Sequence, residues 1–97
     1  MAVNRLYYAC FYAITALLHK NSLDTKTHNG VIRLFGLHFI RTGIIKSGFG
    51  ELYSTLFEMR QDADYEVEVD YEEQDVLELL LPAAELIAAI EKVLSTD

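Results

Sequence analysis

One arginine lies within an otherwise apolar helical stripe in the second half of the chain. Arg60 follows Phe49, Tyr53 and Leu56 at spacings of three and four residues, which place all of them on one side of a helix. A guanidinium group that faces a core must be paired and hydrogen-bonded, or it must reach water. Asp64, one turn further on, is a candidate ionic partner. The alternative is a guanidinium at the rim of a cleft that binds a phosphate, and the sequence leaves both open.

The three histidines are not spaced as a metal site. His19, His28 and His38 lack the separation of four residues that places two ligands on one helical face, and Cys10 adds no ligand spacing. We therefore expect no metal, and no glycine-rich loop indicates another cofactor. His28 stands where a helix is predicted to begin, and a helix N-terminus beside a cation such as Lys26 suits a phosphate. His38 lies on an apolar face and is expected in the core.

An aromatic cluster occupies the first predicted helix and consists of Tyr7, Tyr8, Phe11 and Tyr12. Such rings could form a stacking platform for nucleic-acid bases. Their helical spacing is more typical of core residues, and both interpretations stay open from the sequence.

These side chains must be positioned by helices, because the apolar periodicity is helical along nearly the whole chain. The pattern predicts helices over about 3–20, 27–41 and 48–63, and a fourth from Asp70 to the end of the apolar pattern at Leu94. We expect a single domain, an all-α antiparallel up-down bundle of four helices.

Local signals mark the ends of these helices. Thr27 is a plausible N-cap, and Gly43 stands where a left-handed residue ends a helix. Asp70 and Glu73 have the spacing of a capping box. Pro82 lies inside the fourth pattern, where we expect a kink or a break.

The fourth helix has an apolar stripe that predicts its buried face. The stripe consists of Val76, Leu80, Ala83, Ile87, Ile90 and Leu94. Residues 65–69 before this helix alternate apolar and acidic side chains, which indicates a short extended loop.

The first helix is apolar around its whole circumference, although a surface helix needs a polar face. It needs neighbours on every side, so we expect a homodimer. Its apolar run, residues 6–18, is too short for a membrane span, which needs about 20 residues. The lone Cys10 cannot form an intrachain disulfide, and we expect a cytoplasmic protein without a membrane partner.

The charges are unevenly distributed along the 97 residues, whose net charge is −7. Residues 1–49 carry six Lys or Arg and one acid, whereas residues 50–97 carry two Lys or Arg and 14 acids. Either the two halves pack together and mix their charges, or a basic face binds an anion such as RNA or a nucleotide.

Three segments, taken in order, resemble small bacterial and archaeal HEPN-domain proteins. They are residues 4–13 (NRLYYACFYA), residues 26–31 followed by 34–39 (KTHNGV and LFGLHF) and residues 60–65 (RQDADY). The resemblance implies a helical bundle that is usually dimeric. It also implies an additional amphipathic helix before the first segment, and we expect either that this helix is missing or that the recorded start lies too late in the chain.

Active HEPN ribonucleases carry an arginine followed by a polar residue and, a few residues later, a histidine. Arg60 matches the arginine and Gln61 the polar position, but Tyr65 stands where the histidine would be. A tyrosine with a pKa of about 10 is a poor general base at neutral pH. The resemblance implies at most a weak, metal-independent ribonuclease that binds phosphate at Arg60. We expect Asp64 beside Arg60 at the ligand, with Arg5 or His28 as accessory groups.

The resemblance also implies the toxin component of a toxin–antitoxin pair with a nucleotidyltransferase. Some such partners adenylylate a tyrosine near this motif, and Tyr65 is the matching position. The competing hypothesis is a non-catalytic helical module for dimerisation and docking, in which Arg60 pairs internally with Asp64.

Overall fold

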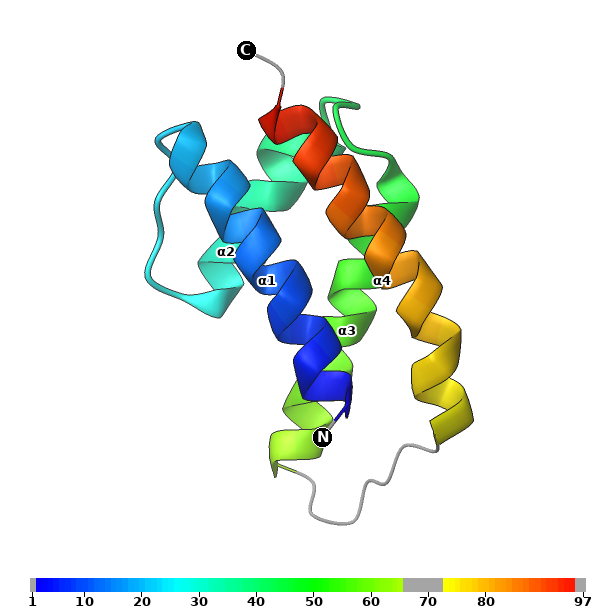
Figure 1. The fold of residues 1–97 in the computed structure, drawn as a ribbon. Coiled ribbons are helices and arrows are strands. Elements are labelled where there is room, and N and C mark those ends of the chain that lie inside the picture. The colour runs from blue at the N-terminus through cyan, green and yellow to red at the C-terminus, as the bar shows by residue number, and fades with distance from the viewer. Residues whose placement is uncertain (1, 66–72, 96–97) are drawn as a thin grey trace.

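A computed structural model describes residues 2–65 and 73–95, which form a bundle of four α-helices (Figure 1). The helices are α1 (Ala2–Lys20), α2 (His28–Phe35), α3 (Ser47–Tyr65) and α4 (Glu73–Leu94). A π-helical turn, Gly36–Ile40, continues α2. Side chains are described for residues 4–61 and 77–95. The predicted all-α bundle is confirmed, and the first three helices begin and end within two residues of the predicted bounds when the π-helical turn is counted with α2.

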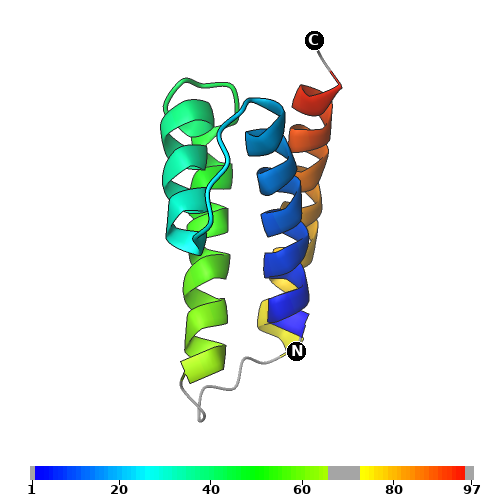
Figure 2. The same ribbon diagram turned by 90° about the vertical axis from the view of Figure 1, so that its left-hand side faces the viewer.

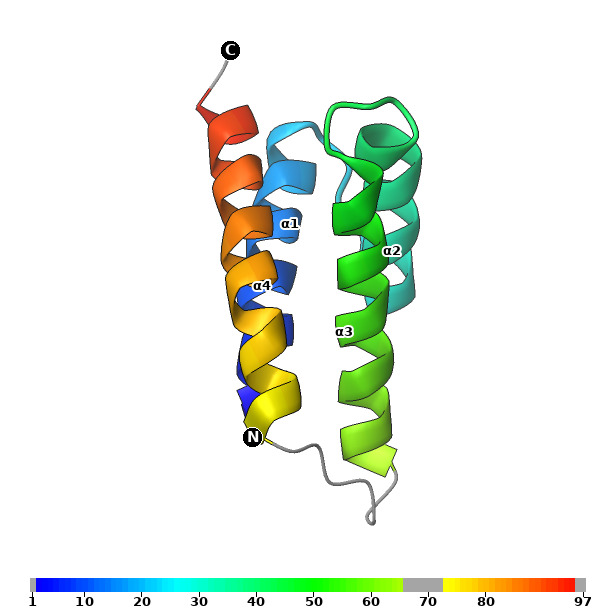
Figure 3. The ribbon, with the colours of Figure 1, turned by 90° about the vertical axis from the view of Figure 1, so that its right-hand side faces the viewer.

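The helices do not alternate strictly in direction. α1, α2 and α4 run the same way along the bundle, and α3 runs opposite to them (Figures 2 and 3). The connection over residues 21–27 returns along the side of the bundle before α2 begins (Figure 2). Seven extended residues reach about 23 Å, and thirteen helical residues rise about 20 Å. The connection is therefore long enough to bring the start of α2 back beside the first half of α1.

The predicted end signals of the second helix are confirmed. The Thr27 hydroxyl oxygen accepts a hydrogen bond from the Gly30 N–H at 2.9 Å, as an N-cap should. Gly43 has a φ of 83°, the left-handed conformation that favours glycine. The helix is wider than an α-helix just before Gly43, because the Arg41 N–H donates to the Gly36 carbonyl five residues earlier, as in a π-helix.

Helix α1 lies at the centre of the packing. It contacts each of the other three helices, so most of its apolar circumference is covered within one chain. The buried core consists of Tyr7, Cys10, Ile14, Leu17, Leu18, Val31, Phe35, Phe39, Ile45, Tyr53, Leu56, Ala83, Leu86 and Ile90. An exposed strip of α1 remains, formed by Arg5, Ala9, Tyr12 and Ala16. The homodimer stays a prediction, since one chain supplies more cover for α1 than its sequence indicated.

The predicted buried face of α4 is partly wrong. Leu80 was expected in the core but is 51% exposed, whereas Leu86 is fully buried. Leucine and alanine occur on both sides of this helix, so apolar periodicity could not decide which side faces the core. Pro82 does not break α4, which is continuous from Glu73 to Leu94. The proline removes the donor for the Glu78 carbonyl, and the exposed position of Glu78 leaves that carbonyl near solvent.

The connection between α3 and α4 was predicted as an extended loop from Tyr65 to Val69. Tyr65 instead ends α3, and residues 66–72 lie outside the described part of the chain. Asp70 of the predicted capping box lies in that segment, while Glu73 is the first residue of α4. None of the helices in the described ranges is long and apolar enough to span a bilayer.

Candidate functional site

Arg60 lies on α3 with its guanidinium group against two tyrosines of α1. Its Nη2 donates a hydrogen bond to the Tyr8 hydroxyl oxygen at 3.1 Å. The guanidinium carbon lies 5.6 Å from the ring centres of both Tyr7 and Tyr8, within the range of a cation–π interaction. Arg60 and Tyr8 are partly buried. The sequence prediction that Arg60 shares its helical face with core residues is confirmed, because Tyr53 and Leu56 on that face are fully buried.

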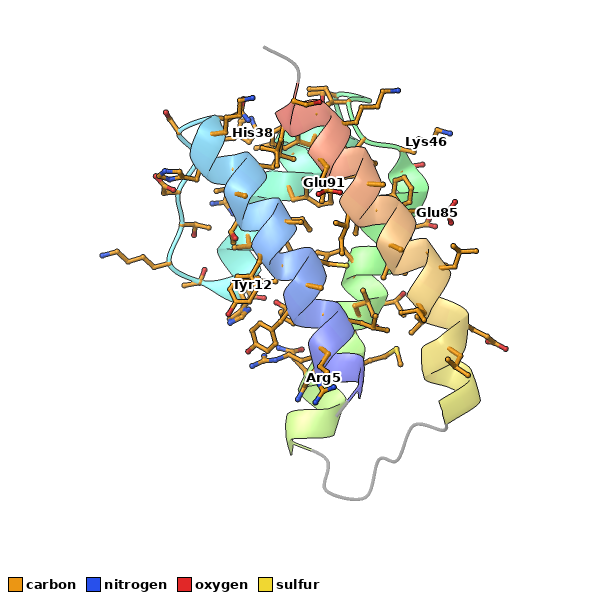
Figure 4. All side chains as sticks on the ribbon, in the orientation of Figure 1. Arg5, Tyr12, His38, Lys46, Glu85 and Glu91 are labelled. Atoms are coloured by element: carbon orange, nitrogen blue, oxygen red, sulfur yellow. The ribbon has the colours of Figure 1, made fainter. Side chains whose placement is uncertain are left out.

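The aromatic cluster of α1 is divided between the core and the surface. Tyr7 is fully buried, and its ring stacks on that of Tyr53 with centroids 5.6 Å apart. Tyr8 meets Tyr7 edge to face at 5.1 Å and is partly buried. Tyr12 is 66% exposed and therefore lies at the surface of α1 (Figure 4). The core interpretation therefore holds for Tyr7, whereas Tyr8 lies at the boundary beside Arg60.

His28 belongs to the same cluster, although it comes from the first turn of α2. Its Nδ1 lies 2.7 Å from the Tyr7 hydroxyl oxygen. Its ring stacks on Phe11 at 4.6 Å and approaches Tyr8 at 6.1 Å between centroids. The Thr27 cap fixes the start of α2 and thereby the position of His28. Arg60 and His28 thus both contact the Tyr7–Tyr8 pair, and the accessory role of His28 stays a prediction.

Tyr53 completes a chain of hydroxyl groups beneath this pair. Its hydroxyl donates to the Tyr7 hydroxyl oxygen at 3.3 Å, and both rings are inaccessible to solvent. Burial is the main cause that raises the pKa of each phenol, although the Arg60 charge partly opposes it. Both hydroxyl groups therefore stay protonated at neutral pH. They can donate and accept hydrogen bonds, but they cannot serve as bases.

The remaining predicted site residues are placed only in part. Asp64 and Tyr65 lie in the last turn of α3, and their side chains fall outside the described ones. The predicted Arg60–Asp64 ion pair and the role of Tyr65 stay predictions. Arg5 is exposed near the start of α1, about one turn before Tyr8 (Figure 4). Its predicted accessory role stays untested as well.

The other titratable groups do not converge on a metal site in the described ranges. No group of three or more His, Cys, Asp or Glu side chains gathers there. His19 forms an exposed hydrogen bond of 2.9 Å with Asp24. His38 lies partly buried in the π-helical turn, not fully in the core as expected. Cys10 is fully buried, and burial raises the pKa of its thiol to about 11.

Two features of the site were missed by sequence reasoning. Tyr53 was placed on the stripe of Arg60, but its bond to Tyr7 was not foreseen. The signal was available, because Tyr53 precedes Arg60 by two helical turns on the same face. Asn4, one turn before Tyr7 and Tyr8, has a buried side-chain oxygen with no hydrogen-bond partner among the described residues. Nothing in the spacing of the sequence singled out this amide.

The larger hollows of the described surface lie away from Arg60. One of about 510 Å³ is lined by residues of α2, the π-helical turn and the first turns of α3, among them Phe35 and Gly50. Another of about 520 Å³ lies between the start of α3 and Pro82. The linings of both are mainly apolar, and neither includes the groups around Tyr7.

Comparison with known proteins identifies a protein family that this chain matches. A family model described as the HEPN domain matches residues 1–93. A "UPF0332 protein" of Thermotoga maritima is 39% identical over 93 residues, which cover 96% of this chain and 70% of that protein. Two proteins of Methanocaldococcus jannaschii, named "Putative toxin MJ0605" and "Putative toxin MJ0142", are 40% and 33% identical over 73 and 79 residues. The chain spans 54% of the length of each of these two. No solved structure matches.

Proposed function

The chain belongs to the HEPN-domain family, and from this premise we propose that it binds the phosphates of RNA or of a nucleotide at Arg60, as the toxin component of a toxin–antitoxin pair. The names of the two archaeal relatives support the toxin role. The partner of such a toxin is an antitoxin, and the nucleotidyltransferase implied by the family resemblance is the candidate. The toxin and its nucleotidyltransferase partner would both have access to RNA in the cytoplasm.

The observation that carries the proposal is the way in which Arg60 is held. Its guanidinium group rests on two tyrosine rings and donates to Tyr8, so its orientation is fixed before a ligand arrives. A preorganised arginine loses less conformational entropy when it binds an anion, and its planar fork matches two phosphate oxygens. The partly buried position reduces competition from water.

Binding is a better-supported activity than cleavage. Burial raises the pKa values of the Tyr7 and Tyr53 phenols near Arg60 and keeps them protonated, which leaves them unsuited to remove a proton from a ribose hydroxyl. Tyr65, at the position of the family histidine, is a weak acid with an ordinary pKa of about 10. We propose that Tyr65 is instead a target for modification by the nucleotidyltransferase, since it ends α3 five residues after Arg60.

A homodimer through the outward face of α4 fits the exposed side chains. Leu77, Leu80 and Leu81 are each more than half exposed, and Ala84 and Ala88 continue the same face. In an antiparallel pair related by a twofold axis, the leucines of one α4 would lie over the alanines of the other. Large side chains would then fill the space that small ones leave.

The charges beside this face favour the same pairing. Glu78, Glu85 and Lys92 follow one flank at spacings of seven residues. Figure 4 shows Glu85 and Glu91 on opposite sides of α4. Antiparallel pairing would bring Glu78 of each copy towards Lys92 of the other, while the two copies of Glu85 would meet near the centre. The ends of the interface gain an attraction, and its centre carries one repulsion.

Direct titration tests the proposed site. A fluorescent single-stranded RNA and labelled ATP are titrated against the wild type, Arg60→Ala and Arg41→Ala, the last being an exposed arginine beyond the π-helical turn. Loss of a charged hydrogen-bond donor costs about 1.5–3 kcal/mol, so Arg60→Ala should weaken binding at least tenfold. Arg41→Ala should bind as the wild type does. Equal binding by all three proteins would remove the site from Arg60 and leave the non-catalytic docking module as the better hypothesis.

A further inference from the structure

Three side chains from three helices form one chain of hydrogen bonds. The Tyr53 hydroxyl of α3 lies 3.3 Å from the Tyr7 hydroxyl of α1, which lies 2.7 Å from Nδ1 of His28 on α2. Tyr53 and Tyr7 are completely buried, whereas His28 is partly exposed. The protons along these two hydrogen bonds can run in either of two directions, and in a third arrangement Tyr7 accepts from both neighbours, which leaves its own buried proton without an acceptor.

The first direction gives both buried tyrosine hydroxyls an acceptor. Tyr53 donates to Tyr7, Tyr7 donates to Nδ1 of His28, and neutral His28 carries its own proton on Nε2. In the reverse direction, Nδ1–H of His28 would donate to Tyr7 and Tyr7 would donate to Tyr53. The Tyr53 proton would then need another acceptor, and Tyr7 is its one hydrogen-bond partner among the described residues. A buried donor without an acceptor costs about 1–3 kcal/mol, so the first direction is favoured.

We propose that Tyr53 and Tyr7 act as a hydroxyl relay that holds neutral His28 as the Nε2–H tautomer, which makes His28 a hydrogen-bond donor to a phosphate oxygen. The relay consists of these two tyrosines, and they are positioning residues for His28. The inference rests on the proposed function for its ligand, but the tautomer itself is a property of the free protein.

The same arrangement prevents neutral His28 from acting as a general base. A general base needs an unprotonated nitrogen facing the substrate. The relay occupies Nδ1 and leaves a proton on Nε2, so neutral His28 has no such nitrogen to offer. His28 therefore complements Arg60 as a second donor near the Tyr7–Tyr8 pair and does not replace the missing family histidine. This agrees with a site that binds phosphate better than it cleaves RNA.

Histidine tautomers are measured directly by long-range proton–nitrogen NMR on the free protein labelled with ¹⁵N. The expected wild-type spectrum has a protonated Nε2 and an unprotonated Nδ1 at His28, with the Tyr7 hydroxyl proton coupled to Nδ1. In Tyr7→Phe, the Nδ1–H fraction should rise about tenfold, because one hydrogen bond worth about 1.4 kcal/mol is lost. The signals of His19 and His38 should not change. A proton bonded directly to Nδ1 in the wild type would overturn the relay.

Tyr53→Phe provides a second variant in case Tyr7→Phe does not fold. Tyr7 keeps Nδ1 of His28 as its acceptor in this variant, and reversal would leave the Tyr7 proton without an acceptor, so the Nδ1–H fraction of His28 should stay as low as in the wild type. A rise of the Nδ1–H fraction in Tyr53→Phe, or an unchanged fraction in Tyr7→Phe, would overturn the relay.

A second arm tests the donor role with inorganic phosphate and with a short RNA as probes. Binding should shift the Hε2 and Nε2 signals of His28 in the wild type, and the shift should be lost in Arg60→Ala. Binding that depends on Arg60 without any shift at His28 would overturn the donor role. Absence of any binding by the wild type would instead refute the proposed function, while the tautomer measurement would still decide the relay.

Discussion

Arg60 and Tyr8 are fifty-two residues apart in the chain, and the Arg60 guanidinium donates to the Tyr8 hydroxyl across 3.1 Å. This contact joins α3 to α1 at the boundary between the core and solvent. It gives Arg60 two roles that can be separated, because one guanidinium can both tie two helices together and bind an anion. Variants of Tyr8 address the first role without removing the cation.

Tyr8→Phe should keep the ring under Arg60 and remove only the hydrogen bond. A hydrogen bond to a charged group contributes about 1.5–3 kcal/mol, and partial exposure of this pair reduces that value. We expect the free energy of unfolding to fall by about 1 kcal/mol and RNA affinity to fall less than in Arg60→Ala. Urea denaturation and RNA titration measure the two effects. Tyr12→Phe on the same helix is the control, since Tyr12 is 66% exposed. A Tyr8→Phe protein that loses as much affinity as Arg60→Ala would show that the hydroxyl itself binds the ligand.

Cleavage of RNA by the wild type should be weak or absent, and Tyr65→His should increase it. The substitution restores the arginine–histidine spacing implied by the family, and a histidine with a pKa of about 6.5 can act as a base at neutral pH. The assay follows a fluorescent RNA with EDTA present, which excludes contaminating metal-dependent nucleases. The double variant with Arg60→Ala is the control and should be inactive. Robust cleavage by the wild type that is abolished in Arg60→Ala would show that the histidine is dispensable.

Leu81→Arg should produce a monomer if the outward face of α4 forms the homodimer. Leu81 is 69% exposed in one chain, so the substitution leaves the core intact and places a charge in the proposed interface. Sedimentation equilibrium at micromolar concentrations measures the mass against the 11.0 kDa of one chain. Ile44→Arg is the matched control, because Ile44 is also exposed but lies outside α4.

The like charges at the centre of the proposed interface give a second check on the same dimer. Glu85→Gln should tighten association, since it removes the repulsion between the two copies of Glu85. A wild-type mass of one chain at every concentration would exclude the dimer altogether.

The buried Cys10 thiol should make the free energy of unfolding fall as the pH rises into the alkaline range. Burial raises the pKa of the Cys10 thiol from 9.0 to about 11. Below pH 9 the thiol is protonated in both states. Between pH 9 and 11 it ionises only in the unfolded chain, so stability is lost as pH rises, by about 2–3 kcal/mol in all. Urea denaturation across this range measures the slope. Cys10→Ala should be less stable than the wild type, but its free energy of unfolding should fall less steeply with pH. The slope that remains comes from Tyr7 and Tyr53, whose pKa values burial also raises. Equal slopes in both proteins would contradict the assignment.

The local features of this protein were predictable because they depend on neighbouring residues. Thr27 caps α2 through a bond to Gly30, three residues away, and Gly43 takes a positive φ that its own lack of a side chain permits. The place of Arg60 on a core-facing stripe follows from helical periodicity within α3. Sequence was sufficient for these features, and with them for the fold class.

The choice of buried face on α4 was not predictable from its own pattern. Leu80 and Leu86 are both leucines at positions that an apolar helix would tolerate inside or outside. Only the packing of α4 against α1 and α3 buries Leu86 and exposes Leu80. A pattern that is apolar on two sides carries no information about which side meets a neighbour.

The sequence by itself determined four helices, the end signals of the second helix and a cation among core residues. The tertiary structure alone decided which groups meet that cation. The Tyr7–His28 bond spans 21 residues and depends on the connection over residues 21–27, which returns along the bundle. The Tyr7–Tyr53 bond spans 46 residues and depends on how α3 packs across α1. Helical periodicity is a property of a few turns, whereas contacts between helices depend on loop path and packing geometry, which no local pattern encodes.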